Sequence, residues 1–464
     1  MDCSCSRGRW AREVRHFASL PLCELFCVLA PHLWLDADLG RRVRRRLFTP
    51  ARTFWLFLSQ AFSADRSCRE AVRRALAWLG AIEDRQASPG TSGYCRARAR
   101  LPQAWLSAIS QRLVERVEQM APGAWLWHGR RVIVADGSTV HLADTLQNQA
   151  LHPQSSQQAK GCGFPLMRIV GLFSLATGVM AALGRASVHT HERVIFARLW
   201  REHLLAGDVV LADRGFCGFA EFFELAKAGI DAVMRRHQRL GPGLKTLRRL
   251  GRGDRLLLWT RTSVPSAGYD REMWNALPTA MAVREITVRV VARGFRTKSL
   301  VILTTLLDAN ALAAKEFADL YRRRWEAELC LRHIKSTLGM GELRAKTPAM
   351  ADRELVVYQI AHNLVRAVMA EAALRHEVAL ERLSFKGTLA TLRTWAPIFA
   401  LGRGNTRDLH RRMLECIAGD RLPLRPGRSE PRAIKRRRNK YALLNAPRHR
   451  FQEIPHRNRH TRAH

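Results

Sequence analysis

Val132-Ile133-Val134-Ala135-Asp136-Gly137 and Val209-Val210-Leu211-Ala212-Asp213-Arg214-Gly215 are the two stretches that decide the fold. Each begins with a short apolar run typical of a buried strand, and each run ends at an aspartate that is followed within two residues by glycine. A carboxylate at the carboxyl end of a buried strand is a common ligand position in α/β folds, and glycine lets other groups approach it closely. One such aspartate is more often a turn residue or a helix cap, but the matching pair indicates a site.

The segments around these two strands predict a mixed sheet. Residues 166–183 favour a β-hairpin around Thr177-Gly178, and residues 230–234 favour another strand. Residues 191–205 and 219–228 have helical patterns. The resulting order β, β, β, α, β, α, β is that of a mixed sheet flanked by helices.

The charge of the chain is its most unusual global property. The 464 residues include 77 Lys and Arg against 40 Asp and Glu, a formal net charge of +37. Such an excess repels itself unless a polyanion neutralises it, which indicates nucleic acid or an anionic membrane surface. No transmembrane segment is visible, and the basic residues are spread along the whole chain, so we expect no membrane partner. The ten cysteines lack the spacing of a zinc site.

A third acidic residue stands within a helical pattern further along. Tyr321, Arg324, Glu328 and Lys335 have offsets that place them within a sector of roughly sixty degrees on a continuous helix. The ordinary interpretation of such a stripe is a solvated face with ion pairs. The residues expected to pack inward on the other side are Ala327, Cys330, Leu331, Ile334 and Leu338.

Convergence of Asp136, Asp213 and Glu328 would create a site with hard oxygen ligands. Mg²⁺ and Mn²⁺ prefer such ligands. Two such ions about 4 Å apart can activate a water or a 3′-hydroxyl and stabilise the leaving oxygen of a phosphodiester.

These motifs resemble those of the insertion sequence 4 family of DDE transposases. The spacing Tyr321-x2-Arg324-x3-Glu328-x6-Lys335 is similar to the helix signature of that family. The blocks Ala135 to Thr139 and Ala212 to Phe216 look like those around its first two acidic residues, and Pro431 to Tyr441 is similar to its basic tails. The resemblance covers about residues 45–448.

The resemblance implies the fold class and the roles of the site residues. We expect an α/β protein with an RNase H-like mixed-sheet core, a β-strand insertion and flanking helical regions. Asp136, Asp213 and Glu328 would bind two Mg²⁺ or Mn²⁺ ions, and Tyr321, Arg324 and Lys335 would contact DNA phosphates. The expected division of the chain is a helical, basic, DNA-binding region at 1–125, a catalytic domain at 126–345 with a β-rich insertion at 238–306, a helical region at 346–420 and a basic tail at 421–464.

Three further features of the sequence bear on base contacts, metal binding and ATP binding. In some relatives a tryptophan of the insertion stacks on a flipped base; Trp259 and Trp274 are the local candidates, although a strand tryptophan is more often a core residue. His189-x-His191-Glu192 has metal-ligating residue types but fits the surface start of a helix equally well. The spacing of a phosphate-binding GxxxxGK[ST] loop is absent, and transesterification needs no ATP, so no ATP site is expected.

The sequence therefore predicts a metal-dependent DNA transposase that cleaves the ends of an insertion sequence and joins them to target DNA. The alternatives are an RNase H-fold nuclease that cuts without joining and an inactive DNA-binding regulator of its element. The expected partners are double-stranded DNA, as terminal inverted repeats and as target, and a second copy of the chain on DNA. The expected location is the bacterial cytoplasm, at the nucleoid.

Overall fold

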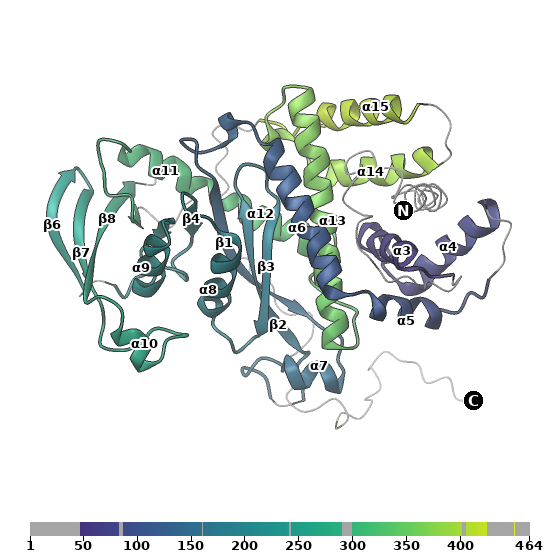
Figure 1. The fold of residues 1–464 in the computed structure, drawn as a ribbon, viewed down its shortest axis with the longest axis horizontal. Coiled ribbons are helices and arrows are strands. Elements are labelled where there is room, and N and C mark those ends of the chain that lie inside the picture. The colour runs from purple at the N-terminus through teal and green to yellow at the C-terminus, as the bar shows by residue number, and fades with distance from the viewer. Residues whose placement is uncertain are drawn as a thin grey trace, which may run out of the picture.

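A single mixed sheet organises the structure (Figure 1). The computed structural model describes residues 47–82, 87–159, 161–240, 243–289, 299–400, 405–424 and 450. Within these residues the sheet has nine strands in the order β3-β2-β1-β4-β5-β9-β8-β7-β6. The strands are β1 (Val132–His141), β2 (Leu166–Ser174), β3 (Met180–Ser187), β4 (Val209–Ala212), β5 (Asp231–Arg235), β6 (Leu244–Gly251), β7 (Asp254–Thr260), β8 (Ala280–Arg289) and β9 (Ser299–Thr304).

The first five strands confirm the RNase H-like core. Strands β1, β2 and β3 are antiparallel neighbours, while β4 runs parallel to both β1 and β5. The parallel steps are connected by helices, as parallel pairing requires. Helix α8 (Glu192–His203) precedes β4, and helix α9 (Phe219–Lys227) connects β4 to β5.

Both faces of this sheet are covered, which explains why β1 and β4 read as continuous apolar runs. Side chains alternate along β1 between two hydrophobic clusters. Val132 and Val134 belong to the cluster that includes the helices carrying Glu328 and the long helix after it. Ile133 and Ala135 belong to the cluster with α8 and α9.

Strand β1 is longer than the sequence predicted. The expected strand ended at Ala135, whereas β1 continues through Asp136 to His141. Its continuation pairs with β2 along its whole length, for example Asp136 with Gly171 and His141 with Leu166. Pairing with an antiparallel partner therefore extends a strand through residues that would otherwise favour a turn.

The strands β6 to β9 continue the same sheet. Strand β9 pairs antiparallel with β5, and β8, β7 and β6 follow outward as antiparallel neighbours. A short helix, α10 (Arg271–Asn275), precedes β8. Strands β6, β7 and β8 lie at the left end of Figure 1.

The remaining helices gather around one long helix, α13 (Pro348–Arg375), at the other end of the sheet (Figure 1). Asn363 of α13 fixes this helix to the sheet: its Oδ1 accepts from the Met180 N–H at 2.8 Å, and its Nδ2 donates to the Met180 carbonyl at 3.0 Å. Helices α3, α6, α14 and α15 all pack on α13. The helices of this group are α3 (Pro50–Phe62), α4 (Cys68–Ile82), α5 (Ser92–Arg100), α6 (Gln103–Met120), α14 (Phe385–Ala400) and α15 (Thr406–Gly419).

Some predictions lie outside the described residues. These are residues 1–46 of the helical region expected at 1–125 and most of the basic tail that begins at Arg421. Among the described helices, none is both long enough and apolar enough to cross a membrane.

Candidate active site

The register of β1 and β4 brings the two aspartates next to each other. Ala135 pairs with Ala212, so Asp136 and Asp213 are the residues that follow at the same level on neighbouring parallel strands. Each carboxylate accepts a local backbone N–H: Asp136 Oδ1 from Gly137 at 3.0 Å, and Asp213 Oδ1 from Gly215 at 2.7 Å. These bonds fix the orientation of both side chains directly after the last residues that pair β1 with β4.

Glu328 comes to the same place on a helix that packs under the sheet. It lies on α12 (Trp325–Arg332), whose Ala327, Cys330 and Leu331 are buried. Burial of these residues, and of Ile334 and Leu338 after them, confirms the inward side of the predicted stripe. The helix is fixed to β1 by this packing, so Glu328 faces the strand that carries Asp136.

The expected continuous helix is interrupted. Helix α11 (Ala314–Arg323) and helix α12 are separated by the single residue Arg324, and residues 333–337 form a π-helical turn. Angles computed for one straight helix therefore do not hold across this segment. The π turn nevertheless directs Lys335 towards β1, where its Nζ donates to Ser138 Oγ at 2.7 Å.

An open depression lies where these elements meet. It is lined by Asp136, Gly137, Ser138, Glu328, Leu331, Arg332, Lys335 and Ser336. Side chains on alternate residues of a strand share a face, so Asp136 and Ser138 point to the same side of β1. The structure thus brings together Asp136, Glu328 and Lys335 around one depression, with Asp213 beside Asp136.

Arg324 lies among these carboxylates. Its Nη2 forms an ion pair with Glu328 Oε1, and its guanidinium carbon lies 6.0 Å from the centre of the Tyr321 ring. Burial raises the pKa of Asp136 to about 6; Arg324 acts against this rise, while the charges of Glu328 and Asp213 add to it. The main cause of the raised pKa is burial, which disfavours the charged carboxylate, and the two neighbouring carboxylates add a smaller effect.

Tyr321 does not present its ring to solvent as the stripe predicted. It is 7% exposed and packs in the core below Arg324. Burial raises the pKa of its hydroxyl. In this conformation Tyr321 supports Arg324, and a DNA phosphate could contact the tyrosine only at its margin.

Trp259 and Trp274 are core residues, each 2% exposed. Trp259 packs edge-on against Phe219 and Phe222 of α9. Trp274 packs edge-on against Phe219, and its Nε1 donates to the Thr262 carbonyl at 2.8 Å. A flipped base could reach neither ring unless this core opened, so the structure favours the core interpretation of both residues.

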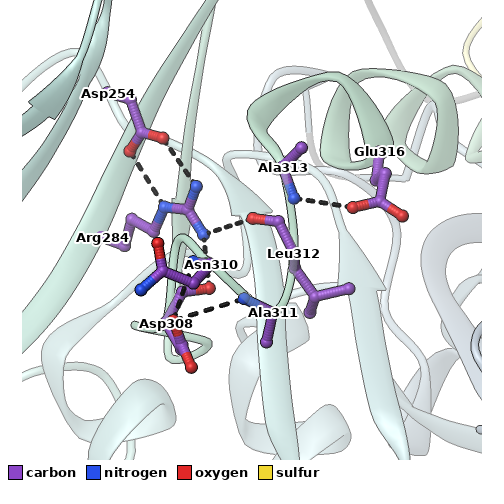
Figure 2. A network of polar contacts seen from close by, with 8 residues as sticks. All are labelled: Asp254, Arg284, Asp308, Asn310, Ala311, Leu312, Ala313 and Glu316. Carbon is purple, nitrogen blue, oxygen red and sulfur yellow. Dashed lines mark hydrogen bonds and ion pairs between the residues drawn. The ribbon is translucent and has the colours of Figure 1, made fainter.

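Arg284 of β8 fixes the segment before α11, which leads to Arg324 and Glu328 (Figure 2). Its side chain is fully buried and bridges three segments. The guanidinium donates to both carboxylate oxygens of Asp254 on β7, at 2.9 and 2.6 Å. It also donates to the carbonyls of Asp308 and Leu312, at 3.1 and 2.8 Å. The added strands therefore anchor the segment from which α11 begins, and with it Arg324 and Glu328.

The three carboxylates Asp136, Asp213 and Glu328 have the chemistry to bind a hard divalent cation, but their side chains are not gathered around one point. Among the described residues, no three His, Cys, Asp or Glu side chains are gathered closely enough to hold an ion. Glu328 is turned towards Arg324, which supplies positive charge next to Asp136. The three carboxylates belong to adjacent elements: β1, the end of β4, and α12.

Sequence reasoning missed three residues on or around this site. Ser138, the partner of Lys335, stands two residues after Asp136 and could have been found from the strand alternation. Arg284 gave no signal, because an arginine in an alternating strand reads as solvent-facing. Glu192 was considered only as part of a His-rich helix start, yet its carboxylate lies against Gly137.

Comparison with known proteins places the chain in a family. Residues 127–364, just over half of the chain, match the profile described as the transposase DDE domain. The chain belongs to the DDE transposase family. The match spans β1 to α13 and includes all three acidic residues together with Tyr321, Arg324 and Lys335.

Individual relatives confirm the resemblance seen in the motifs. The transposase is 28% identical over 322 residues to the transposase InsG for insertion sequence element IS4 of Escherichia coli (strain K12), covering 68% of this chain and 70% of that one. It is 43% identical over 51 residues to the putative transposase InsL for insertion sequence element IS186A of the same strain, covering 11% and 14%. A cryo-EM structure of the piggyBac transposase synaptic complex with hairpin DNA matches with a TM-score of 0.40 and 10% identity, covering 90% of this chain and 87% of that one.

Proposed function

We propose that this transposase uses Asp136, Asp213 and Glu328 together to bind divalent metal ions, cleaves DNA at the ends of an insertion sequence and joins the ends to target DNA. The observation that carries the proposal is the register Ala135–Ala212, which sets the two aspartates side by side opposite Glu328. The raised pKa of Asp136 supports it, because burial and the other two carboxylates make the charged form unfavourable until a cation arrives.

Mg²⁺ or Mn²⁺ suits three carboxylates, and we propose two such ions. Bound there, they would lower the pKa of an attacking water or hydroxyl and stabilise the leaving oxygen. The residues that would hold them are Asp136, Asp213 and Glu328. Arg324 forms an ion pair with Glu328, and we propose that it exchanges this carboxylate for a DNA phosphate when the cation binds.

Neither step of the proposed reaction needs a nucleotide cofactor. In cleavage, a water oxygen bonds to phosphorus and the P–O3′ bond breaks, which leaves a 3′-hydroxyl and a 5′-phosphate. In joining, the 3′-hydroxyl attacks a target phosphorus, loses its proton, and one target P–O3′ bond breaks. One phosphodiester replaces another, so ATP is not required.

Lys335 and Arg324 are suited to hold the DNA strand during both steps. Lys335 lines the depression, and its ammonium donates to the Ser138 hydroxyl. Burial lowers the pKa of Lys335 because the charged ammonium is poorly solvated there. A phosphate oxygen, which carries negative charge, would therefore be a stronger partner than this hydroxyl. Arg324 offers a planar fork that matches two phosphate oxygens. Tyr321 backs the guanidinium from below and limits its freedom.

The partners we propose are double-stranded DNA, as the terminal inverted repeats and the target, and a second copy of the chain assembled on that DNA. The charge of +37 supports a polyanionic partner. We propose the helical region at 1–125 and the basic tail as DNA-binding parts, and the nucleoid as the place of action. We propose the remaining regions with the bounds expected from the sequence: a catalytic domain at 126–345 with a β-rich insertion at 238–306, and a helical region at 346–420.

Glu328→Gln tests the proposal against a matched control on the same helix. Glu326→Gln removes a carboxylate two residues away that is 38% exposed and pairs with Arg323. With a DNA fragment carrying the ends that flank this reading frame, Glu328→Gln should abolish Mg²⁺-dependent cleavage while DNA binding survives, and Glu326→Gln should cleave normally. Cleavage by Glu328→Gln at the wild-type rate would overturn the metal-ligand assignment. Cleavage without any joined product would favour the nuclease, and a wild-type protein that binds but never cuts would favour the regulator.

A further inference from the structure

Glu192 lies against the strand that carries the first catalytic aspartate. A Cβ placed on Gly137 would lie 2.5 Å from the carboxyl carbon of Glu192 and within 2.8 Å of both of its oxygens. The absent side chain of Gly137 therefore makes the space that this carboxylate occupies. Gly137 directly follows Asp136, so the Glu192 carboxylate touches β1 where Asp136 leaves it.

Asp213 lies next to β1 at a point from which its carboxylate can reach either side of that strand. Strand alternation directs Asp136 towards α12 and the position of Gly137 towards α8. Asp213 follows the last residue of β4, so it lies at the strand end where both sides are accessible. Its charge reaches both neighbours: it adds to the raised pKa of Asp136 and, after burial and against Arg168, to the raised pKa of Glu192.

Hydrogen bonds hold the residues on either side of Glu192 at the start of α8. His191 caps the helix, its Nδ1 accepting from the Arg193 N–H at 3.3 Å. Arg193 is joined to the buried Glu221 of α9 by two hydrogen bonds of 2.8 and 2.5 Å. His191 and Arg193 thus have structural roles, and Glu192 between them is left for another one.

No partner within the described residues satisfies this carboxylate. Its one ion pair there is with Arg168, whose Nη1 lies 4.0 Å from Oε1, and it accepts no hydrogen bond from the described part of the chain. The Arg168 Nε is itself buried and has no hydrogen-bond partner among the residues that the structure describes. The neighbouring Glu221 is buried and satisfied by Arg193, whereas the Glu192 side chain is 33% exposed and accessible to water or a cation.

From this geometry we propose that Glu192 is a fourth carboxylate of the catalytic centre and binds a divalent cation held by Asp136 and Asp213, directly or through a water on the ion. The inference rests on the proposed metal-binding role of the three acidic residues. It assigns to the His-x-His-Glu segment a function in the same site rather than a separate metal site.

Manganese binding by the full-length, DNA-free protein tests the inference without relying on activity. Mn²⁺ is titrated into the wild type and Glu192→Gln, and free Mn²⁺ is measured by electron paramagnetic resonance. Glu192→Gln should weaken binding about tenfold, the usual size for loss of a supporting ligand. The control is Glu202→Gln, on the same helix with its side chain 71% exposed, which should bind Mn²⁺ like the wild type.

Glu328→Gln separates failure of this inference from failure of the proposed function. If Glu328→Gln weakens Mn²⁺ binding and Glu192→Gln does not, the role of Glu192 is wrong and the proposed site stands. If neither variant changes binding, the metal site itself is wrong.

A second pair of variants separates a metal role from a packing role. Gly137→Ala should displace the Glu192 carboxylate, so both the melting temperature and Mn²⁺ affinity should fall. Gly137→Ala combined with Glu192→Ala removes the clash, so the melting temperature should recover while Mn²⁺ affinity stays low. Recovery of both properties would overturn the inference, because Mn²⁺ binding would then be independent of the carboxylate.

Discussion

Asp136 should destabilise the metal-free protein near neutral pH, and Asp136→Asn should therefore stabilise it. The pKa of this carboxyl is raised from 3.8 to about 6 by burial and by the charges of Glu328 and Asp213, despite Arg324. A shift of about 2 units at 1.36 kcal/mol each corresponds to a cost of about 3 kcal/mol once the group is fully ionised. Asparagine retains the oxygen that accepts the Gly137 N–H but carries no charge.

The direction of the pH dependence follows from the raised pKa. The folded protein binds the proton of Asp136 more tightly than the unfolded chain, so this group favours folding at low pH. That contribution is lost as the pH rises from about 4 to about 6, and the full cost remains above pH 6. The gain from Asp136→Asn should be up to about 3 kcal/mol at pH 7.5 and about half of that at pH 5.

Urea unfolding in the presence of a chelator measures these free energies. Asp319→Asn is the control, because Asp319 is an exposed residue of α11 whose pair with Arg322 is worth less than about 1 kcal/mol. Added Mg²⁺ should stabilise the wild type and not Asp136→Asn. The reasoning is refuted if Asp136→Asn is less stable than the wild type at pH 7.5 without metal, or if its gain does not shrink at pH 5.

Three further predictions concern the frame of the site and its DNA. Arg284→Met leaves the Asp254 charge buried without its partner and should lower the free energy of unfolding by about 3–5 kcal/mol. The control Arg248→Met, at an exposed position of β6, should change this free energy little. Equal urea midpoints for the two variants would contradict the anchoring role of Arg284. Arg324→Ala should reduce joining of a precut end to supercoiled target more than it reduces nicking, since the guanidinium fork grips phosphate; joining at the wild-type level would make that residue part of an ordinary solvated face. DNA affinity should fall steeply with salt, with a log–log slope near −0.9 per phosphate neutralised, and deletion of residues 425–464 should flatten that slope; an unchanged slope would mean that the tail does not touch phosphates.

The core strands could be predicted because each apolar run is visible in a few consecutive residues. The apolar runs before Asp136 and Asp213 require burial on both faces, and this alone predicts two inner strands. The extension of β1 to His141 could not be predicted, because Asp136-Gly137-Ser138 resembles a turn until β2 pairs with it. Strand register depends on which partners meet in space, and one sequence does not display it.

The limits of helical geometry explain the remaining differences at the site. The spacing from Tyr321 to Lys335 predicted a shared stripe, and the structure keeps Arg324, Glu328 and Lys335 near β1. The break at Arg324 and the π turn after α12 change the angles between them. Burial of Tyr321 and Arg284 depends on packing by distant segments, and periodicity along the chain contains no information on those contacts.

The central claim is that Asp136, Asp213 and Glu328 bind divalent cations at one place, and anomalous scattering from crystals of the protein grown with Mn²⁺ tests it most directly. The account predicts manganese density between these three carboxylates, with the Glu328 side chain released from Arg324. Manganese bound elsewhere, or an intact Arg324–Glu328 pair beside manganese-free aspartates at saturating Mn²⁺, would contradict it.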